Sequence, residues 1–178
     1  MKWRHKAFVQ NIISKLPERL SYDLYYRTQR KWGGLKSFNP SSRMVAGSET
    51  IKRIIDAGQS PVGGDFFEVG TGRVPIVPMT YWLLGANSTV TVDLNPYLKN
   101  ELVNEALKFM LENRSICGDI LGSNLIMKRL DSLLDLASSD HVSTDEFLDL
   151  CSIKYLAPGD ASQTDIDDGA IDFHTSYT

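Results

Sequence analysis

Hydrophobic residues in the first third of the chain recur at helical spacing. Residues 2–15 place Trp3, Ile12 and Ile13 on one side, which predicts an amphipathic helix. The same spacing predicts a second helix over residues 18–32. A third is expected over residues 48–57, with Ser48 as N-cap. These helices form a predicted N-terminal cap segment, residues 1–62.

The pattern changes at residue 65, where polar residues give way to a short apolar run. Residues 65–69 are rich in aromatic and β-branched side chains, which favours a buried parallel strand. Gly70 and Gly72 follow it. Because neither has a Cβ, the backbone can turn sharply there and a ligand can approach the main chain closely.

A helix is expected next, beginning near Val74 or Pro75 and ending at Gly85. A second strand then ends at Asp93. An apolar strand, a glycine turn, a helix and a strand ending in an acid form the first half of a nucleotide-binding βαβ unit.

Three further helical stretches separate this unit from the next strand pattern. They cover residues 95–113, residues 121–137 as one helix or a pair, and a short helix after Ser143 that ends at Leu150. Since one crossover needs only one helix, we interpret residues 97–150 as an insertion that helps to shape a substrate pocket.

Two turns follow the helical stretches: a Pro-Gly-Asp turn that ends at Asp160 and an acidic turn at residues 165–169. The strand–turn–helix–strand pattern predicts an α/β fold for residues 63–178.

The spacing of the glycines distinguishes between the known kinds of nucleotide-binding site. A dinucleotide fingerprint needs a third small residue where this chain has Pro75, and the P-loop pattern Gly-x-x-x-x-Gly-Lys-Ser/Thr is absent. What remains is an acid followed by Gly-x-Gly, with Glu68 directly before the turn.

This pattern resembles motif I of the class I S-adenosylmethionine-dependent methyltransferases. The phrase Glu-x-Gly-Thr-Gly-Arg-x-Pro-x-x-Pro, with Leu-Gly-Ala before the second strand, is similar to a bacterial small-molecule subgroup. The resemblance covers about residues 65–176. It implies that the glycine turn lies against the amino-acid part of S-adenosylmethionine. Asp93 would hold the two ribose hydroxyls, because a carboxylate accepts two hydrogen bonds from a vicinal diol.

The resemblance also implies a Rossmann-like, doubly wound, mostly parallel sheet, with a third strand that leads from Lys154 into the turn at Asp160 and a fourth strand over residues 170–176. Asp160 and the backbone of Ala161 would meet the adenine. The cofactor-binding residues implied by the resemblance are Glu68, Gly70, Thr71, Gly72, Asp93, Leu94, Asp160, Ala161 and Ser176. Helices before motif I commonly cap the substrate in this family, which makes the following residues candidates to face it: Tyr22, Tyr26, Arg27, Gln29 and Arg30.

Each motif has a structural alternative. Gly-x-Gly after an apolar run is often only a turn, and Asp93 and Asp160 are residue types that favour turns at strand ends. Glu68 would then be a structural acid that caps nearby N–H groups. His174 lies near the right strand end for a general base, but it could equally be a packing residue. No residue identifies itself as catalytic.

Members of the resembled family continue past this point to a sheet of order 3-2-1-4-5-7-6. The present sequence supplies strands 3, 2, 1 and 4, so the fourth strand is expected to be an exposed edge. Three explanations remain open: a fragment of a longer enzyme, completion by another chain, and a dimer through the exposed strands.

Composition and charge narrow the classes of protein. With 178 residues and two cysteines, Cys117 and Cys151, that form no framework, the chain fits one soluble cytoplasmic domain with reduced core thiols. No metal is expected from three isolated histidines, and no apolar run is long enough to span a membrane.

Residues 1–62 carry a net charge of +8 and residues 63–178 a net charge of −11. The basic segment would either recruit an anionic substrate or pack on the acidic domain; nucleic acid is not expected. We therefore expect methyl transfer from S-adenosylmethionine to an oxygen or nitrogen of a small molecule or glycan precursor. A non-catalytic S-adenosylmethionine-binding fragment is the alternative, and an NAD-type oxidoreductase is disfavoured by Pro75.

Overall fold

A computed structural model describes residues 18–177 of the chain, which forms two compact units, Met1–Phe38 and Asn39–Thr178. Helix α2 (Glu18–Trp32) belongs to the first unit and has the predicted bounds. The predicted helix over residues 2–15 lies outside the described residues. The boundary between the units lies after Phe38, whereas the sequence pattern placed the end of the cap segment at residue 62.

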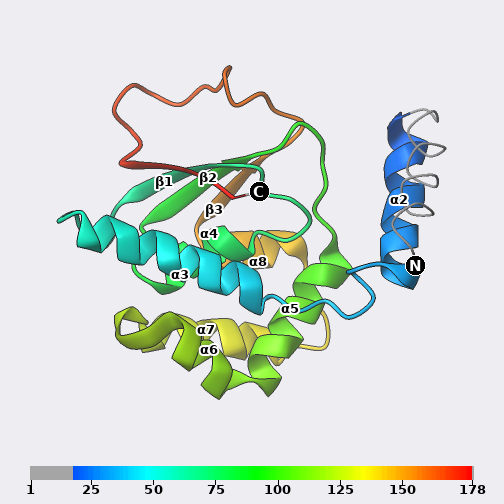
Figure 1. Cartoon of the computed structure of the whole chain (residues 1–178), viewed down its shortest axis with the longest axis horizontal. Coiled ribbons are helices and arrows are strands. Elements are labelled where there is room, and N and C mark those ends of the chain that lie inside the picture. Colours follow the sequence, from blue (N-terminus) through cyan, green and yellow to red (C-terminus); the bar gives the residue numbers. More distant parts are fainter. Residues whose placement is uncertain (1–17, 178) are drawn as a thin grey trace. The chain divides into compact units, whose positions relative to one another are not determined.

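The second unit is built on a four-stranded parallel sheet with the predicted order β3-β2-β1-β4. In register, Glu68 of β1 lies opposite Thr91 of β2 and Thr175 of β4. Figure 1 shows β1, β2 and β3 side by side, with α4 and α8 beneath them. The strands are β1 (Asp65–Val69), β2 (Ser88–Val92), β3 (Ile153–Leu156) and β4 (Phe173–Ser176). This arrangement confirms an α/β fold that is consistent with a Rossmann-like sheet.

Helix α4 (Ile76–Leu83) is the core of this unit, because every one of its residues is buried. Tyr81 of α4 stacks on Phe66 of β1, with 4.6 Å between the ring centroids. An apolar helix against a buried strand accounts for the uninterrupted hydrophobic sequence here.

Helix α3 (Ser41–Asp56) packs against α4. A Cβ on Gly47 would lie 2.7 Å from the Cβ of Thr80, so glycine permits this close approach. The prediction that the helix begins at Ser48 was wrong. Ser48 lies inside the helix, where its hydroxyl donates to the carbonyl of Ile120 at 3.0 Å, a long-range bond that local capping preference cannot reveal.

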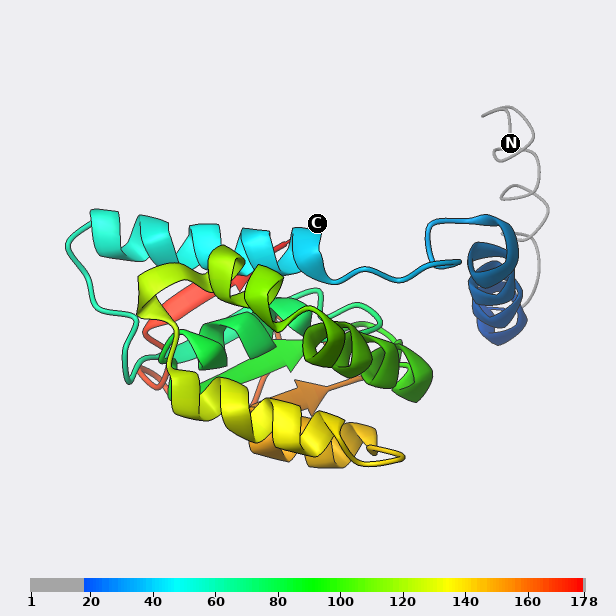
Figure 2. The same ribbon diagram turned by 90° about the horizontal axis from the view of Figure 1, so that it is seen from below.

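The insertion between β2 and β3 is helical, as predicted. It contains α5 (Asn100–Glu112), α6 (Arg114–Leu121), a short 3-10 turn (Gly122–Asn124), α7 (Met127–Ala137) and α8 (Thr144–Leu150). Seen from below, α3, α6 and α7 lie in front of the strands (Figure 2). The Ser143 capping box is confirmed: its hydroxyl accepts the Glu146 N–H, and the Glu146 carboxylate accepts the Ser143 N–H.

Two predicted boundaries in the insertion were wrong. Helix α5 begins at Asn100 and not at residue 95, because Tyr155 of β3 binds the main chain of the preceding segment in a non-helical conformation. The Tyr155 hydroxyl accepts the N–H of Tyr97 at 3.0 Å and donates to the carbonyl of Asn95 at 3.2 Å. The second predicted stretch, residues 121–137, contains one α-helix, α7, after the 3-10 turn, and a further helix that was not predicted, α6, precedes it at Arg114–Leu121.

The segment 157–172 connects β3 to β4 without a helix or strand, and β4 begins at Phe173 rather than at residue 170. Cys117 and Cys151 are buried free thiols, as expected. Within residues 18–177, no helix is long and apolar enough to cross a membrane.

Candidate functional site at the carboxyl end of the sheet

The strand order creates a topological switch point beside β1. Strands β2 and β3 lie on one side of β1 and β4 lies on the other, so the connection after β1 leads to β2 on one side and the connection after β3 crosses to β4 on the other. Open α/β sheets bind their ligands in the crevice outside such strand ends. Glu68 ends the buried part of β1, and the glycine turn follows at this position.

The glycine turn is left-handed at both glycines, with φ of +96° at Gly70 and +71° at Gly72. The N–H of Gly70 donates to the carbonyl of Val92 at 2.9 Å, which fixes the turn against the end of β2. The hydroxyls of Thr71 and Thr91 lie 2.6 Å apart and add a second link. A Cβ on Gly72 would meet no atom within 4 Å, so the turn faces open space there.

Asp93 lies between the glycine turn and the segment that follows β3. Its carboxylate Oδ2 accepts the N–H of Gly72 at 2.6 Å. Its own carbonyl accepts the N–H of Gly159 at 2.9 Å, and its N–H donates to Leu156 at 3.0 Å. Partial burial raises the pKa of Asp93, while hydrogen bonds from Gly72 and Thr71 act in the opposite direction.

Glu68 is 2% exposed and belongs to a hydroxyl network that links β1, α4 and β4. The Thr175 hydroxyl donates to Glu68 Oε2 at 3.1 Å. Burial raises the pKa of Glu68 to about 7, and the hydrogen bonds from Thr175 and Tyr81 oppose this shift. Burial and the charge of Glu68 also raise the pKa of Tyr81.

A cavity of about 220 Å³ opens beside the glycine turn, and we call it the switch-point cavity. It brings together residues from α3, β1, the glycine turn, α4 and the end of β4. Its lining residues are Arg43, Glu68, Gly70, Thr71, Gly72, Val74, Val77 and Tyr177.

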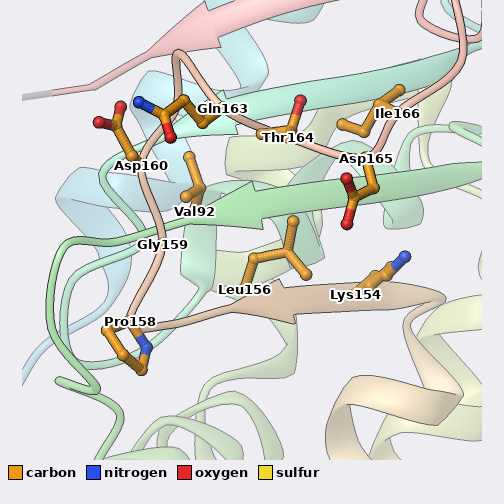
Figure 3. Close-up of a pocket in the computed structure, with 10 residues that line it drawn as sticks. All are labelled: Val92, Lys154, Leu156, Pro158, Gly159, Asp160, Gln163, Thr164, Asp165 and Ile166. Carbon is orange, nitrogen blue, oxygen red and sulfur yellow. The ribbon is translucent and has the colours of Figure 1, made fainter.

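A second cavity, of about 210 Å³, lies between β2, β3 and the segment after β3, and we call it the loop cavity. Val92 and Leu156 come from the strands, and Figure 3 shows Gln163, Thr164 and Ile166 of the loop lying over them. Glu68 pairs with Thr91, so these two side chains point to the same face of the sheet, and the side chain of the next residue, Val92, points to the other face. Since Glu68 lines one cavity and Val92 the other, the two cavities lie on opposite faces of the sheet. Asp93, at the carboxyl end of β2, lines neither cavity but bonds one lining residue of each, Gly72 and Gly159.

Asp160 is an exposed turn residue that also lines the loop cavity. Its Oδ1 accepts the N–H and the hydroxyl of Ser162, at 2.8 and 2.7 Å. These bonds lower the pKa of Asp160. Within the protein, the Asp160 side chain therefore acts as the structural alternative expected, by stabilising a turn. Ala161 is the next residue of that turn.

Leu94 and Ser176 lie at the same edge of the sheet but line neither cavity. The Leu94 side chain is 71% exposed although it directly follows Asp93. The Ser176 hydroxyl donates to the carbonyl of Val69 at 3.2 Å, so it joins β4 to β1. The neighbouring Thr175, which the sequence did not single out, is the residue of β4 that bonds Glu68.

Of the nine predicted cofactor-binding residues, five line a cavity: Glu68, Gly70, Thr71 and Gly72 the switch-point cavity, and Asp160 the loop cavity. Asp93 bonds the glycine turn, and Leu94, Ala161 and Ser176 line neither cavity. Sequence reasoning missed Arg43 and Tyr177, which line the switch-point cavity. Arg43 lies before the predicted start of its helix, so only a correct start at Ser41 would have drawn attention to it.

The remaining candidates stay predictions. His174 is exposed, and its ring centroid lies 5.3 Å from that of Phe67. The five cap candidates (Tyr22, Tyr26, Arg27, Gln29 and Arg30) all lie on α2 of the first unit. Among residues 18–177, no group of three or more His, Cys, Asp or Glu side chains is arranged to hold a metal ion.

No protein-family model matches the chain, and comparisons with curated proteins and with solved structures likewise find no match. The chemistry of the site is therefore inferred from its residues and their geometry.

Proposed function

We propose that this chain binds S-adenosylmethionine at the carboxyl end of its sheet and transfers the methyl group to an oxygen or nitrogen of a small molecule or glycan precursor. The observation that carries the proposal is the position of Asp93. Its carboxylate follows β2 and bonds Gly72, which lines the switch-point cavity, and its main chain bonds Gly159, which lines the loop cavity. A ligand with a diol between two different ends matches this order of features.

The carboxylate of Asp93 fits the ribose of such a ligand. A carboxylate offers about four lone-pair sites. One oxygen of Asp93 already accepts the Gly72 N–H, and the Thr71 hydroxyl also contributes. Acceptor capacity remains for two vicinal hydroxyls, and the bond to Gly72 holds the carboxylate in a fixed orientation.

The glycine turn fits the other side of the ligand. The space next to Gly72 is one that a Cβ would enter, and the protein itself places no atom there within 4 Å. A glycine with positive φ and open surroundings lets a ligand contact the main chain. Pro75, which is buried at the N-cap of α4, occupies the third position of the dinucleotide pattern and argues against NAD.

The base end of the ligand is supported by exposed Leu94 and by the Asp160–Ala161 turn. Leu94 presents a large apolar side chain to solvent directly after Asp93, suited to cover one face of an aromatic base. Asp160 and Ala161 lie in the segment that bonds the Asp93 main chain through Gly159.

When bound, S-adenosylmethionine supplies an electrophilic methyl group activated by its sulfonium sulfur. The residues of this chain orient that ligand: Asp93 holds its middle, and the glycine turn holds one end. An acceptor hydroxyl of high pKa would also need a general base. His174 is the exposed candidate near the end of β4.

Calorimetric titration with S-adenosylmethionine, S-adenosylhomocysteine and NADH tests the cofactor. We expect the first two to bind and NADH not to bind; binding of NADH alone would overturn the proposal. Binding of S-adenosylmethionine without turnover on any of a panel of hydroxyl and amine acceptors would favour a non-catalytic binding protein.

The ribose assignment predicts that Asp93→Ala weakens binding of S-adenosylhomocysteine by about a hundredfold, since two hydrogen bonds to a charged group are lost. Asp168→Ala is the matched control, because Asp168 is an exposed acid in the segment 157–172. The affinity of Asp168→Ala for S-adenosylhomocysteine should equal that of the wild type. An unchanged affinity of Asp93→Ala would refute the role of Asp93.

A further inference from the structure

Helix α2 of the first unit has one side that is exposed to solvent. Between Leu20 and Trp32, the exposed residues of this helix are Leu20, Asp23, Leu24, Arg27, Lys31 and Trp32. Four of them follow one another at intervals of four, three and four residues, which places them in one row along the helix. We call this row the exposed stripe of α2; it consists of Leu20, Leu24, Arg27 and Lys31.

Other residues of α2 make contacts within the first unit. Tyr26 is buried, and Arg30 donates to the carbonyl of Leu35 at 2.9 Å. Gln29 Oε1 accepts the N–H of Gly34 at 3.3 Å. These contacts fix the orientation of the end of α2, which leaves the exposed stripe on the solvent side.

The exposed stripe combines aliphatic and cationic side chains. Leu20 is 60% exposed and Leu24 is 44% exposed, and the two cations follow them along the row. At the end of the helix, Trp32 is 65% exposed, and Lys31 Nζ lies 4.6 Å from the centroid of its ring. Large apolar side chains grouped on a surface, among charged ones, mark an interaction site.

Charge limits the kind of surface that the exposed stripe fits. Residues 1–38 contain nine Lys and Arg and two Asp and Glu, a net charge of +7, whereas residues 39–178 carry a net charge of −10. A polyanionic surface therefore attracts the first unit and repels the second. Asp23, the exposed acid beside the stripe, is outnumbered by Arg27 and Lys31.

An anionic lipid bilayer satisfies both kinds of side chain. Leucines enter the boundary between headgroups and acyl chains, and long cations keep their stems there while their charges reach the phosphates. Tryptophan is enriched at the same boundary. We propose that the exposed stripe of α2 docks this protein on an anionic lipid surface, where Leu20, Leu24 and Trp32 insert and Arg27 and Lys31 bind lipid phosphates. This inference goes beyond the proposed function and does not depend on it.

Two other partners fit the exposed stripe less well. In a pair of identical chains, Arg27 and Lys31 of one copy would face the same cations of the other, and like charges in an interface oppose association. A nucleic acid would attract the cations, but its phosphates leave Leu20 and Leu24 without an apolar partner.

Co-flotation of the full chain with lipid vesicles tests the docking. We expect binding to phosphatidylcholine vesicles that contain about one third phosphatidylglycerol, and binding about tenfold weaker or less to phosphatidylcholine alone. Raising the salt concentration from about 0.1 M to about 1 M should weaken the binding to anionic vesicles, since the Debye length falls from about 10 Å to about 3 Å.

Two double variants separate the apolar and the charged contributions. Leu20→Gln combined with Leu24→Gln should weaken binding to the anionic vesicles by about tenfold or more, because two aliphatic side chains no longer enter the bilayer. Arg27→Gln combined with Lys31→Gln should weaken it by about thirtyfold, because each cation close to an anionic membrane adds to the attraction. All four side chains are exposed, so both variants should fold; thermal unfolding checks this.

Matched controls come from the second unit. Leu111→Gln with Ile116→Gln removes two exposed apolar side chains, from α5 and α6. Arg53→Gln with Lys128→Gln removes two exposed cations, from α3 and α7, and changes the net charge by the same amount as the stripe variant. Neither control should change vesicle binding.

Trp32 supplies a readout that a purely structural role of α2 would not move. When anionic vesicles are added, tryptophan emission should shift to shorter wavelength, and Trp32→Phe should reduce this shift, since the exposed ring enters a less polar layer. A shift that Trp32→Phe leaves unchanged would show that this ring does not insert.

The remaining outcomes would overturn the docking. They are a wild type that does not bind anionic vesicles, and control variants that lose as much binding as the stripe variants. Binding to an oligonucleotide but not to vesicles, unchanged by the two leucine substitutions, would identify a nucleic-acid surface instead. Dimers in sedimentation that the leucine substitutions dissociate, without vesicle binding, would identify a second copy as the partner. None of these results bears on the binding of S-adenosylmethionine, which calorimetry tests separately.

Discussion

At the scale of single residues, the site depends on the backbone conformation of Gly72 and on the carboxylate of Asp93. Gly72 adopts a φ of +71° with open space around it, and Asp93 accepts its N–H. Left-handed backbone costs other residues roughly 1–2 kcal/mol, so a glycine is expected at this position. Because Gly72 has no side chain, the open space beside it is also available to a ligand.

Gly72→Ala should therefore have two separate effects. We expect it to lower the free energy of unfolding by about 1 kcal/mol, because of the positive φ. It should also weaken S-adenosylhomocysteine binding by at least about tenfold, since the new methyl group enters the space of the ligand.

Gly169→Ala is the matched control for this prediction. Gly169 has a φ of +78°, equally open surroundings and no contact with either cavity. Its stability loss, measured by urea unfolding, should be similar and its affinity unchanged. If both variants bind like the wild type, the space beside Gly72 is not part of the site.

At the scale of elements, the position of α4 decides where the glycine turn points, and α7 helps to hold α4. The Arg129 guanidinium donates to the carbonyls of Trp82 and Ala86, the latter at 2.7 Å, and lies 5.2 Å from the Trp82 ring. In addition, the N–H of Ile126 donates to the carbonyl of Leu83 at 3.0 Å. These bonds satisfy the carbonyls of Leu83 and Ala86 and give a second donor to that of Trp82, which also accepts the Gly85 N–H at 3.0 Å.

Arg129→Ala should lower the free energy of unfolding by about 2–4 kcal/mol, because it leaves partly buried carbonyls without their charged donor. Arg114→Ala provides the comparison, since Arg114 makes an exposed ion pair with Asp131 at 2.6 Å. Such surface pairs contribute at most about 1 kcal/mol. Chemical denaturation measures both values, and equal losses would contradict the role of Arg129.

Local patterns predicted the elements more accurately than their boundaries. The capping box at Ser143 was predicted correctly because both partners lie within one turn of each other. The starts of α3 and α5 were not, because Ser48 bonds Ile120 and Tyr155 holds the segment before α5. Those contacts join residues far apart in sequence, and no local propensity contains them.

At the scale of the whole molecule, Glu68 connects β1 to β4 and α4, so its ionisation acts on the stability of the sheet. Its pKa is about 7 in the folded state and near 4.5 in the unfolded state. Between these two values the folded state binds more protons than the unfolded state. The Glu68 contribution to stability is therefore greatest below pH 4.5 and is lost as the pH rises to 7.

We expect the free energy of unfolding of the wild type, relative to Glu68→Gln, to fall by about 3 kcal/mol between pH 4.5 and 8. The difference between the two proteins removes the contribution of the other carboxylates. Glu49→Gln, on the exposed surface of α3, should follow the wild type. A constant difference between wild type and Glu68→Gln across this range would contradict the raised pKa.

The sequence by itself determined the local features of this protein. The apolar run before Gly70, the positive-φ glycines of the turn and the acid after β2 all reflect short-range steric and hydrophobic demands. From them followed the α/β class, whereas the strand order β3-β2-β1-β4 was implied by the resemblance of the motifs to a known family and is confirmed by the structure.

Only the tertiary structure decided which side chains meet. It brings Arg43 of α3 and Glu68 of β1 into one cavity and places Thr175, rather than Ser176, on the Glu68 carboxyl. It also turns the Asp93 carboxylate onto the N–H of Gly72. The physical reason is that burial and helix packing set these distances, and both depend on residues far from each other in the chain.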